Sequence, residues 1–568
     1  MPEKNKPSLL LTLGASGLLI GGGIAAYLIL SQRTSWLGDM PVGANIIPQD
    51  ALLTVSVTTD ADQWQQLREF GTKQTQAELD KNLAELRDSF LTANGYNYQH
   101  DIQPWVGQEV TIAFLSPHNP LTTKSSPNSS ATATNKQSVL MVLPIDNSAA
   151  AKQILLKPKL LKQGKWVARN YKGVQIKETQ GVPSQNYSTT VLDQRFLVVS
   201  DNPKTTERAI DAYKGGASIA KTDGYTQALD KIKAQHFAQF YINVPAAARV
   251  AAANPSRSFS PQGLAQLQNQ QGWASTVTLE SEGIRFKSIS WLKQNSQRVH
   301  MVENKAGKMQ SRLPADTLMM ISGGDLQQLW QDYAQGVSNP LAPIPPENLR
   351  GGVKSLTGLD LERDLLSWMG GFSLSIIPAA PTGDSKDFAL SLLFMVETRD
   401  RLKAEKSLQQ LDKVISREYQ FHIQKTKVGG KPVFNWISPY GTLTATHGWV
   451  DENTAFLTLG APIVEQIIPK PAIALASTEQ FQKTVPAVSP NNGQFFLNVN
   501  STVKALPLYQ FLPNQQTLLE AMRSIGVTAA VSDQRSVRYD IFVSLKKADK
   551  PGSLPSPEPM STTQPISP

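Results

Sequence analysis

The feature that most constrains the fold of this chain of 568 residues is an internal repeat. Five short motifs recur in the same order in the second half of the sequence. The separation between partners falls steadily, from 266 residues at Pro48 and Pro314 to 253 residues at Arg285 and Arg538. Chance matches would scatter, so the sequence predicts a duplication. The matched stretches are 47–53 with 313–319, 101–107 with 363–370, 196–199 with 456–459, 239–244 with 494–499, and 283–286 with 536–539.

The repeat predicts the domain organisation. We expect two diverged copies of one unit over residues 46–292 and 312–546, since 568 residues are too many for one hydrophobic core. Residues 31–45 and 293–311 are the expected linkers, and the second is short enough that the copies should pack against each other. Residues 547–568 are rich in Pro, Ser and Thr, which is typical of a disordered tail.

Within each copy, strand patterns alternate with helix patterns. In the first copy, residues 51–57, 110–114 and 138–143 are β-branched or apolar and predict strands. Asp60 or Asp62 is expected to cap a helix. Strands that follow strands, interrupted by helices, predict the α+β class, with a mostly antiparallel sheet and helices on one side.

Residues 9–30 form an apolar stretch of 22 residues without a charge. About 20 apolar residues span the hydrocarbon core of a bilayer, so this stretch predicts one N-terminal transmembrane helix. Lys4 and Lys6 before it and Arg33 after it favour a cytoplasmic N-terminus at residues 1–8, with the remainder exported. The alternative is a cleaved signal peptide, which normally has a shorter apolar region and an Ala-x-Ala site.

Two sets of residues are candidates for contacts with the membrane or a partner. Gly17 and Gly21 lie four residues apart, a spacing that lets two membrane helices pair closely, although glycine is common in such helices anyway. Basic side chains recur at corresponding regions of the two copies. They either contact anionic headgroups or an acidic partner, or simply form a solvated helix face. They are Lys152, Lys157, Lys159, Lys162 and Lys165 in the first copy and Arg399, Arg401, Lys403 and Lys406 in the second.

The sequence contains no recognisable catalytic or cofactor motif. It has no cysteine, which excludes disulfides, thiolate nucleophiles and cysteine–zinc sites. Its six histidines lack ligand spacing, and neither a phosphate-binding loop nor a Gly-x-Ser-x-Gly motif occurs. We therefore expect no metal, no cofactor and no enzyme activity. The net charge of +9 is modest for this length and favours proximity to an anionic membrane over nucleic-acid binding.

Two motifs that follow the apolar stretch carry a resemblance to a known family. With Ile-Pro-x-Asp-Ala-Leu at residues 47–52 and Pro-Trp-x-Gly-x-Glu at residues 104–109, the chain resembles domain-of-unknown-function family 3352, found largely in cyanobacteria. The resemblance implies that the exported side is the periplasm or the thylakoid lumen, and it brings no catalytic residues. The second copy departs from the pattern, with Leu366 and Ser367 before its tryptophan and Phe372 where a glutamate is expected.

Three functional hypotheses follow. The first is a non-enzymatic binding or scaffold protein at the cell envelope or thylakoid membrane. The second is an exported hydrolase or envelope-processing enzyme with a site between the two copies, because duplicated folds often bind ligands at their interface. The third is a lipid or pigment carrier, which would need a large apolar cavity. The pockets of the structure discriminate among them.

Overall fold

The computed structural model describes residues 40–90, 96–116, 137–155, 164–181, 187–252, 267–300, 306–334, 346–379, 390–506 and 516–548. The expected transmembrane stretch at residues 9–30, with Gly17 and Gly21, lies outside these residues, as does nearly all of the predicted tail. Within the described part of the chain, no helix is both long and apolar enough to cross a bilayer.

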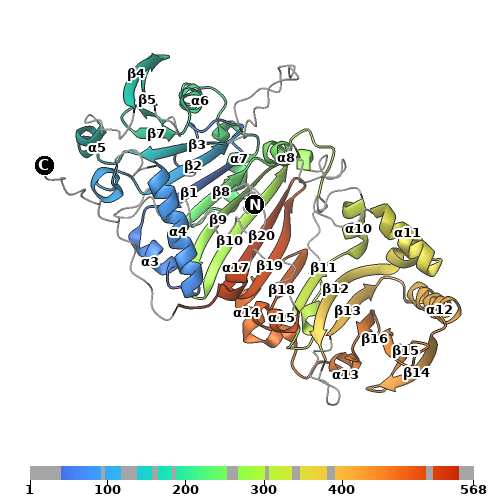
Figure 1. Cartoon of the computed structure of the whole chain (residues 1–568). Coiled ribbons are helices and arrows are strands. Elements are labelled where there is room, and N and C mark those ends of the chain that lie inside the picture. The colour runs from blue at the N-terminus through green and yellow to red at the C-terminus, as the bar shows by residue number, and fades with distance from the viewer. Residues whose placement is uncertain are drawn as a thin grey trace, which may run out of the picture. The chain divides into compact units, whose positions relative to one another are not determined.

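The chain folds into two units, which are coloured along the sequence in Figure 1. The first unit comprises the described residues up to Thr226, together with Lys233–Ile242 and the residues from Lys547 onward. The second unit comprises Gln227–Ile232 and Asn243–Lys546. Each unit is built around an antiparallel sheet.

The strands of the first unit are hydrogen-bonded in the order β8–β1–β2–β3–β7–β6–β5–β4. Strand β1 carries the β-branched residues Val55 and Val57 and is buried on both faces along most of its length. The strands are β1 (Leu53–Thr58), β2 (Glu109–Leu115), β3 (Ser138–Pro144), β4 (Lys165–Tyr171), β5 (Val174–Gln180), β6 (Ser188–Leu192), β7 (Phe196–Ser200) and β8 (Ala238–Ile242).

The strands of the second unit follow the order β9–β10–β20–β19–β18–β11–β12–β13–β17–β16–β15–β14. The β9–β10 hairpin therefore joins the second unit, although the sequence assigns it to the first copy. The strands are β9 (Gln270–Glu280), β10 (Gly283–Leu292), β11 (Met319–Gly323), β12 (Met369–Pro378), β13 (Leu390–Thr398), β14 (His422–Val428), β15 (Lys431–Ile437), β16 (Leu443–Trp449), β17 (Thr454–Gly460), β18 (Gly493–Leu497), β19 (Met522–Asp533) and β20 (Ser536–Leu545).

Helices lie between the strands, and several begin at a capping side chain. Asp60, Asn202 and Asp400 each accept a hydrogen bond from a backbone N–H in the first turn, as expected for helix N-caps. The helices are α3 (Ala61–Leu67), α4 (Lys73–Phe90), α5 (Ser148–Leu155), α6 (Pro203–Tyr213), α7 (Tyr225–Lys231), α8 (Val244–Ala252), α10 (Leu326–Ala334), α11 (Pro346–Thr357), α12 (Arg401–Glu418), α13 (Val464–Ile467), α14 (Glu479–Thr484), α15 (Val499–Ala505) and α17 (Gln516–Ala521).

The predicted α+β class with antiparallel sheets is confirmed. The duplication remains a prediction, and so do the copy boundaries. The two matched tryptophans nevertheless resemble each other in burial, in the turn that precedes them and in the hydrogen bond of the indole. Trp105 and Trp368 are 1% and 2% exposed, and each follows a short π-helical turn, η2 (Tyr98–Ile102) or η5 (Leu361–Leu365). Each indole Nε1 donates to the carbonyl oxygen four residues earlier, at 2.6 Å and 3.2 Å respectively.

Each tryptophan should stabilise the strands that follow it. We expect Trp105→Ala and Trp368→Ala each to lower the free energy of unfolding by about 3–5 kcal/mol, because a large buried ring is lost. Hydrogen exchange should locate the loss at β2 and β3 for Trp105→Ala and at β12 and β13 for Trp368→Ala. The matched controls Trp105→Phe and Trp368→Phe keep a ring and should cost less. A loss below about 1 kcal/mol would contradict the assignment of both residues to the core.

Candidate functional site

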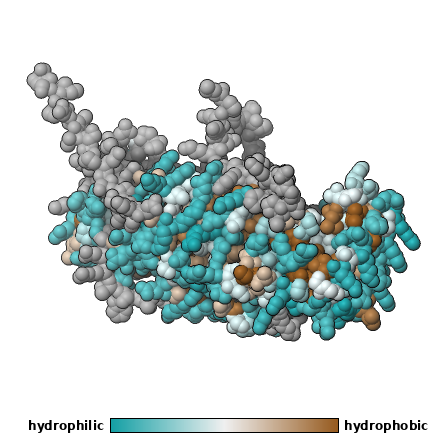
Figure 2. All heavy atoms as spheres, turned by 90° about the horizontal axis from the view of Figure 1, so that it is seen from below, coloured by the Kyte–Doolittle hydropathy of each residue, from teal (hydrophilic) through white to brown (hydrophobic). Residues whose placement is uncertain are grey.

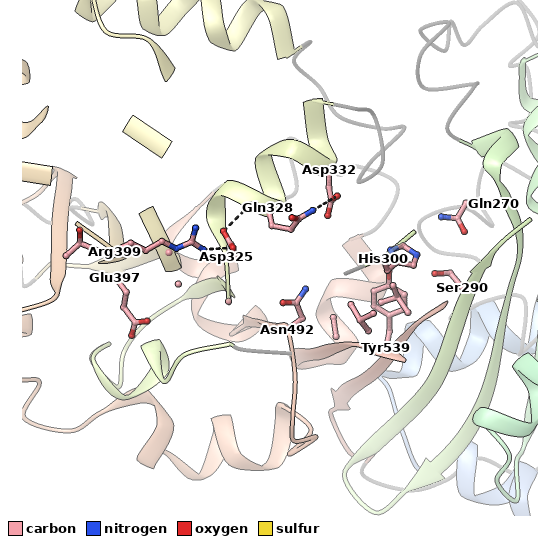
Figure 3. A pocket seen from close by; sticks show the side chains of 17 residues that line it. Gln270, Ser290, His300, Asp325, Gln328, Asp332, Glu397, Arg399, Asn492 and Tyr539 are labelled. Atoms are coloured by element: carbon pink, nitrogen blue, oxygen red, sulfur yellow. Dashed lines mark hydrogen bonds and ion pairs between the residues drawn. The ribbon is translucent and has the colours of Figure 1, made fainter. Parts of the chain in front are cut away.

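A pocket of about 600 Å³ lies within the second unit (Figure 3). The β9–β10 hairpin and strand β20 form one side, with Gln270, Ser290 and Tyr539. Helix α10 with the residue before it, and the end of β13 with the residue after it, form another side, with Asp325, Gln328, Asp332, Glu397 and Arg399 labelled in the same view. The remaining lining residues are His300, Gly324, Gly370, Gly371, Thr398, Asn492, Ala529, Val531 and Val537.

Two ion pairs fix the acidic side chains at one side of the pocket. Asp325 accepts the backbone N–H of Gln328 at 3.0 Å, so it holds the start of α10, and it also pairs with Arg399. Glu397 pairs with Arg312 at 3.1 Å. Gly371 packs directly against Glu397, since a Cβ at this position would lie 2.8 Å from a carboxylate oxygen. The pocket therefore presents groups of both charges, and Arg399 and the two carboxylates are each held in an ion pair.

Two further titratable groups of the pocket, Asp332 and His300, are biased toward their neutral forms. Burial raises the pKa of Asp332, although a hydrogen bond from Gln328 at 3.0 Å and the nearby His300 and Arg298 act in the opposite direction. Burial lowers the pKa of His300, despite the nearby carboxylates of Asp332 and Asp533. Desolvation disfavours the charged form of either group, so the dominant cause is the same for both.

Two buried polar atoms of the pocket wall have no hydrogen-bond partner among the described residues. They are Nε2 of His300 and Oε1 of Gln270. The hydroxyl of Ser290, by contrast, bonds the phenol of Tyr539, whose pKa is raised by burial. A buried polar atom without a partner costs about 1–3 kcal/mol, so His300 and Gln270 favour a bound polar group at this position.

The sheet that carries the pocket has one covered and one open face. On the covered face, Met320, Leu393 and Phe456 are at most 2% exposed and belong to the core that includes α13 and α14. On the other face, Ile321 and Leu459 are 39% and 41% exposed. We name this surface the open face. Its residues are Met319, Ile321, Leu374, Ile376, Leu392, Phe394, Leu457, Leu459, Phe495, Leu497, Ile525, Val527 and Ile541, all half-buried or exposed. Figure 2 shows that hydrophobic residues do reach the surface among hydrophilic ones.

The basic residues proposed from the sequence are spread over several elements of the two units. Arg399 lines the pocket, and Arg401 pairs with Glu405 at 2.9 Å while its guanidinium lies 4.0 Å from the centre of the Trp449 ring. Lys403 and Lys406 lie on α12, and exposed Lys152 and Lys165 belong to α5 and β4 of the first unit. Lys157, Lys159 and Lys162 lie outside the described residues.

Most of the residues that line the pocket could not have been identified from the sequence. Gln270, His300, Asp332 and Tyr539 come from four separate stretches of the chain, so no local spacing links them. Asp325 carried the one usable signal, an aspartate directly before a helix. Among the described residues, no three His, Asp or Glu side chains are grouped as a metal site would require.

The family to which the chain belongs is now clear. The family model described as "Protein of unknown function (DUF3352)" matches residues 12–545, so the chain is a member of that family and the resemblance in its motifs is confirmed. The comparison with curated proteins finds no match. Similar solved structures include crystal forms IV and III of TP0453, both 9% identical in sequence, with TM-scores of 0.25 and 0.23. The alignments cover 46% of this chain and 88% or 89% of TP0453. At these TM-scores the likeness supports no conclusion about this chain.

His300 should make the second unit sensitive to acid. Burial lowers its folded-state pKa below the usual histidine value, so the unfolded chain binds a proton first as the pH falls. The free energy of unfolding should therefore decrease as the pH drops below about 6.5. Denaturant titrations between about pH 7.5 and about pH 5, a range that brackets the usual histidine pKa, measure this slope. Hydrogen exchange at β19 and β20 locates the change. His300→Gln should flatten the slope, whereas the exposed control His422→Gln should not; equal slopes in all three proteins would contradict the assignment.

Proposed function

We propose that this chain is a membrane-anchored, extracytoplasmic binding protein, built from two copies of one α+β unit, which acts without catalysing a reaction. The pocket of the second unit carries the binding part of the proposal. It combines two buried polar atoms, on His300 and Gln270, that have no hydrogen-bond partner among the described residues, with the fixed charges of Asp325 and Arg399. Such a concave site with a few convergent polar groups is the usual form of a ligand site.

Contacts that recur in the two halves support the duplication. The N–H of Ile219 donates to the carbonyl of Ile47 at 3.0 Å, and the N–H of Leu475 donates to that of Leu313 at 2.8 Å. Isolated antiparallel bridges adjoin both contacts. They join Pro48 with Ser218 and Pro314 with Ala474. Strands also pair in one order, β8–β1–β2–β3–β7 in the first half and β18–β11–β12–β13–β17 in the second.

The pairing of β10 with β20 supports the same conclusion. These strands are the last of each predicted copy, and they run antiparallel with Lys287 opposite Asp540. These two residues are 253 positions apart, as are the matched Arg285 and Arg538. The register is therefore symmetric about this pair, as expected when two equivalent edges meet around a twofold axis.

The anchor is supported by the apolar length of residues 9–30 and the flanking charges of Lys4, Lys6 and Arg33. If the anchor holds, the bulk lies in the periplasm or the thylakoid lumen. Exposed Lys152, Lys165 and Lys406 remain candidates for contact with anionic headgroups. A pairing of anchors through Gly17 and Gly21 would be compatible with the same topology.

Topology is directly measurable. A reporter that is active only outside the cytoplasm, fused after Leu545, should be active, because the positive charges before the anchor keep the N-terminus inside. Deleting residues 9–30 should leave the reporter inactive. Activity of a reporter that works only in the cytoplasm, at the same fusion point, would reverse the orientation and overturn the proposed location.

The hydrolase alternative has one observation in its favour, since Ser290, His300 and Asp332 line the same pocket. The hydroxyl of Ser290, however, bonds the phenol of Tyr539 rather than an imidazole. Burial also raises the pKa of Asp332, which weakens a carboxylate that would have to orient the histidine. This hydrogen bond and the raised pKa of Asp332 both favour a binding site over a catalytic site.

Ser290 should therefore be unreactive. We expect a fluorophosphonate probe to leave the full chain unlabelled, because no base activates this hydroxyl. Mass spectrometry of the digested protein measures the labelling, and Ser290→Ala identifies any background at other serines. Labelling of Ser290 that His300→Gln abolishes would contradict the non-enzymatic proposal and support the hydrolase.

A further inference from the structure

The open face has an unusual distribution of side chains. Side chains of successive residues in a strand point to opposite faces. In β12, the covered face receives Ser373 and Ser375, both fully buried, while the open face receives Leu374 and Ile376. In β13, Ser391 is 1% exposed and its neighbour Leu392 is 37% exposed. At these positions the open face thus carries larger apolar side chains than the covered face, whereas a sheet face toward water is usually polar.

The open face is continuous across neighbouring strands. One row of residues that lie opposite one another consists of Ile541, Val527, Phe495, Ile321, Leu374, Phe394 and Leu457, on β20, β19, β18, β11, β12, β13 and β17. Seven strands at about 4.8 Å spacing span about 29 Å. An acyl chain that reaches the bilayer midplane is about 15 Å long, half of the hydrocarbon thickness, so the row is long enough to hold one.

Helix α10 covers one end of these strands. Leu326 and Trp330 of α10 pack against the cluster of Phe372, Val396 and Trp368. Leu392 lies in β13, on the same face as Val396 and four residues before it. It is opposite Leu459 of β17, and both leucines are exposed. In the first unit the corresponding residues are buried. They are Val55, Ile112, Met141 and Phe240, at 3% exposure or less. The exposure is therefore a property of the second unit.

The open face adjoins the pocket on the same side of the sheet. The row next to Ile321 consists of Gly323, Gly493, Ala529 and Tyr539, and the last two line the pocket. The row continues from Gly323 to Phe372, whose ring lies against the glycine, since a Cβ at Gly323 would lie 2.6 Å from a ring carbon. The apolar surface and the polar pocket thus meet on β19 and β20, where Val527 and Ile541 precede or follow Ala529 and Tyr539 by two residues on the same face. Together, the open face offers an apolar binding surface and the pocket offers a polar one.

We infer that the second unit binds a single phospholipid, with its acyl chains on the open face and its head group in the pocket. The acyl chains would cover Leu374, Leu392 and Leu459, which carry no polar groups that need a partner. The head group would meet charges of both signs at Asp325 and Arg399, beside His300, whose Nε2 has no hydrogen-bond partner in the described part of the chain. The inference rests on the proposed function, because the anchor would hold the chain beside a source of lipid.

A protein partner or a second copy of the chain would fit the open face less well. Either would cover the apolar rows, but neither accounts for the adjoining pocket with its charges and unpartnered polar atoms. An amphiphile matches both parts through one molecule. Contiguous apolar surface of this kind marks an interaction site rather than ordinary scattered exposure.

Photolabelling tests the inference with the full chain reconstituted into phosphatidylcholine vesicles. One probe is a phosphatidylcholine that carries a diazirine at the end of an acyl chain, and the second carries it on the head group. After illumination and digestion, we expect the chain probe to label peptides of β13 and β17, and the head-group probe to label the peptide that contains Asp325 and Gln328. Replacing Leu392 and Leu459 by Lys should reduce the chain labelling of these peptides about tenfold, because a charge disfavours hydrocarbon contact.

The matched control is Leu402→Lys on α12, where the leucine is 73% exposed and not part of the open face. It should leave the labelling unchanged. Labelling confined to residues 9–30 would overturn the lipid site while keeping the anchor, whereas failure of the chain to float with the vesicles would overturn the anchor itself. A concentration-dependent dimer that the Leu392 and Leu459 replacements dissociate would identify the open face as a subunit interface and overturn the inference.

Discussion

The alternation of side chains across the antiparallel strands of the second unit is the constraint on which the account depends. Because Met320, Leu393 and Phe456 form the core on one face, their strand neighbours must point to the other. Sliding a strand by one residue would bury Ile321 but expose Met320, so the register is fixed by the core. The open face is therefore a consequence of the same ladder that stabilises the unit.

The ladder also sets the relation between the open face and the pocket. Antiparallel pairing carries the row of Ile321 and Val527 directly beside the row of Gly323 and Ala529. The β9–β10 hairpin extends this sheet past β20 and contributes Gln270 and Ser290 to the pocket. A contact formed by the last strands of both predicted copies thus completes a site within the second unit.

Much of the fold was predictable from the sequence because it depends on local patterns. The strands at residues 51–57, 110–114 and 138–143 and the Asp60 cap lie where the patterns indicated. Register was harder to predict. The two halves can be aligned through the strand pairing that begins at Leu52 and Leu318. In this alignment Phe456, which lies opposite Met395, corresponds to Val198 and not to the predicted Phe196. Matching apolar letters in a short strand does not resolve a shift of two residues, since both alignments keep the same face.

The departure of the second copy from the family motif also has a structural explanation. In the first unit, Glu109 accepts the N–H of Val42 at 2.9 Å and lies 3.3 Å from Nε2 of His236. Its carboxylate holds the pKa of His236 above the usual value, although burial alone would lower it. In the second unit, Phe372 lacks a carboxylate, and Glu397 of the neighbouring strand lies against Gly371 instead. Sequence spacing could not reveal this exchange between strands.

The site itself was less predictable, because its residues meet only through tertiary contacts. The alternation of Leu374, Ser375 and Ile376 was visible in the sequence, but only burial reveals which side is open. Native mass spectrometry of the full chain, released from membranes into the gas phase, tests the central claim most directly. The account predicts one tightly bound phospholipid per chain, lost when Leu392 and Leu459 are replaced by Lys and kept in Leu402→Lys. A chain that carries no lipid, or that keeps it in all three proteins, would contradict the account.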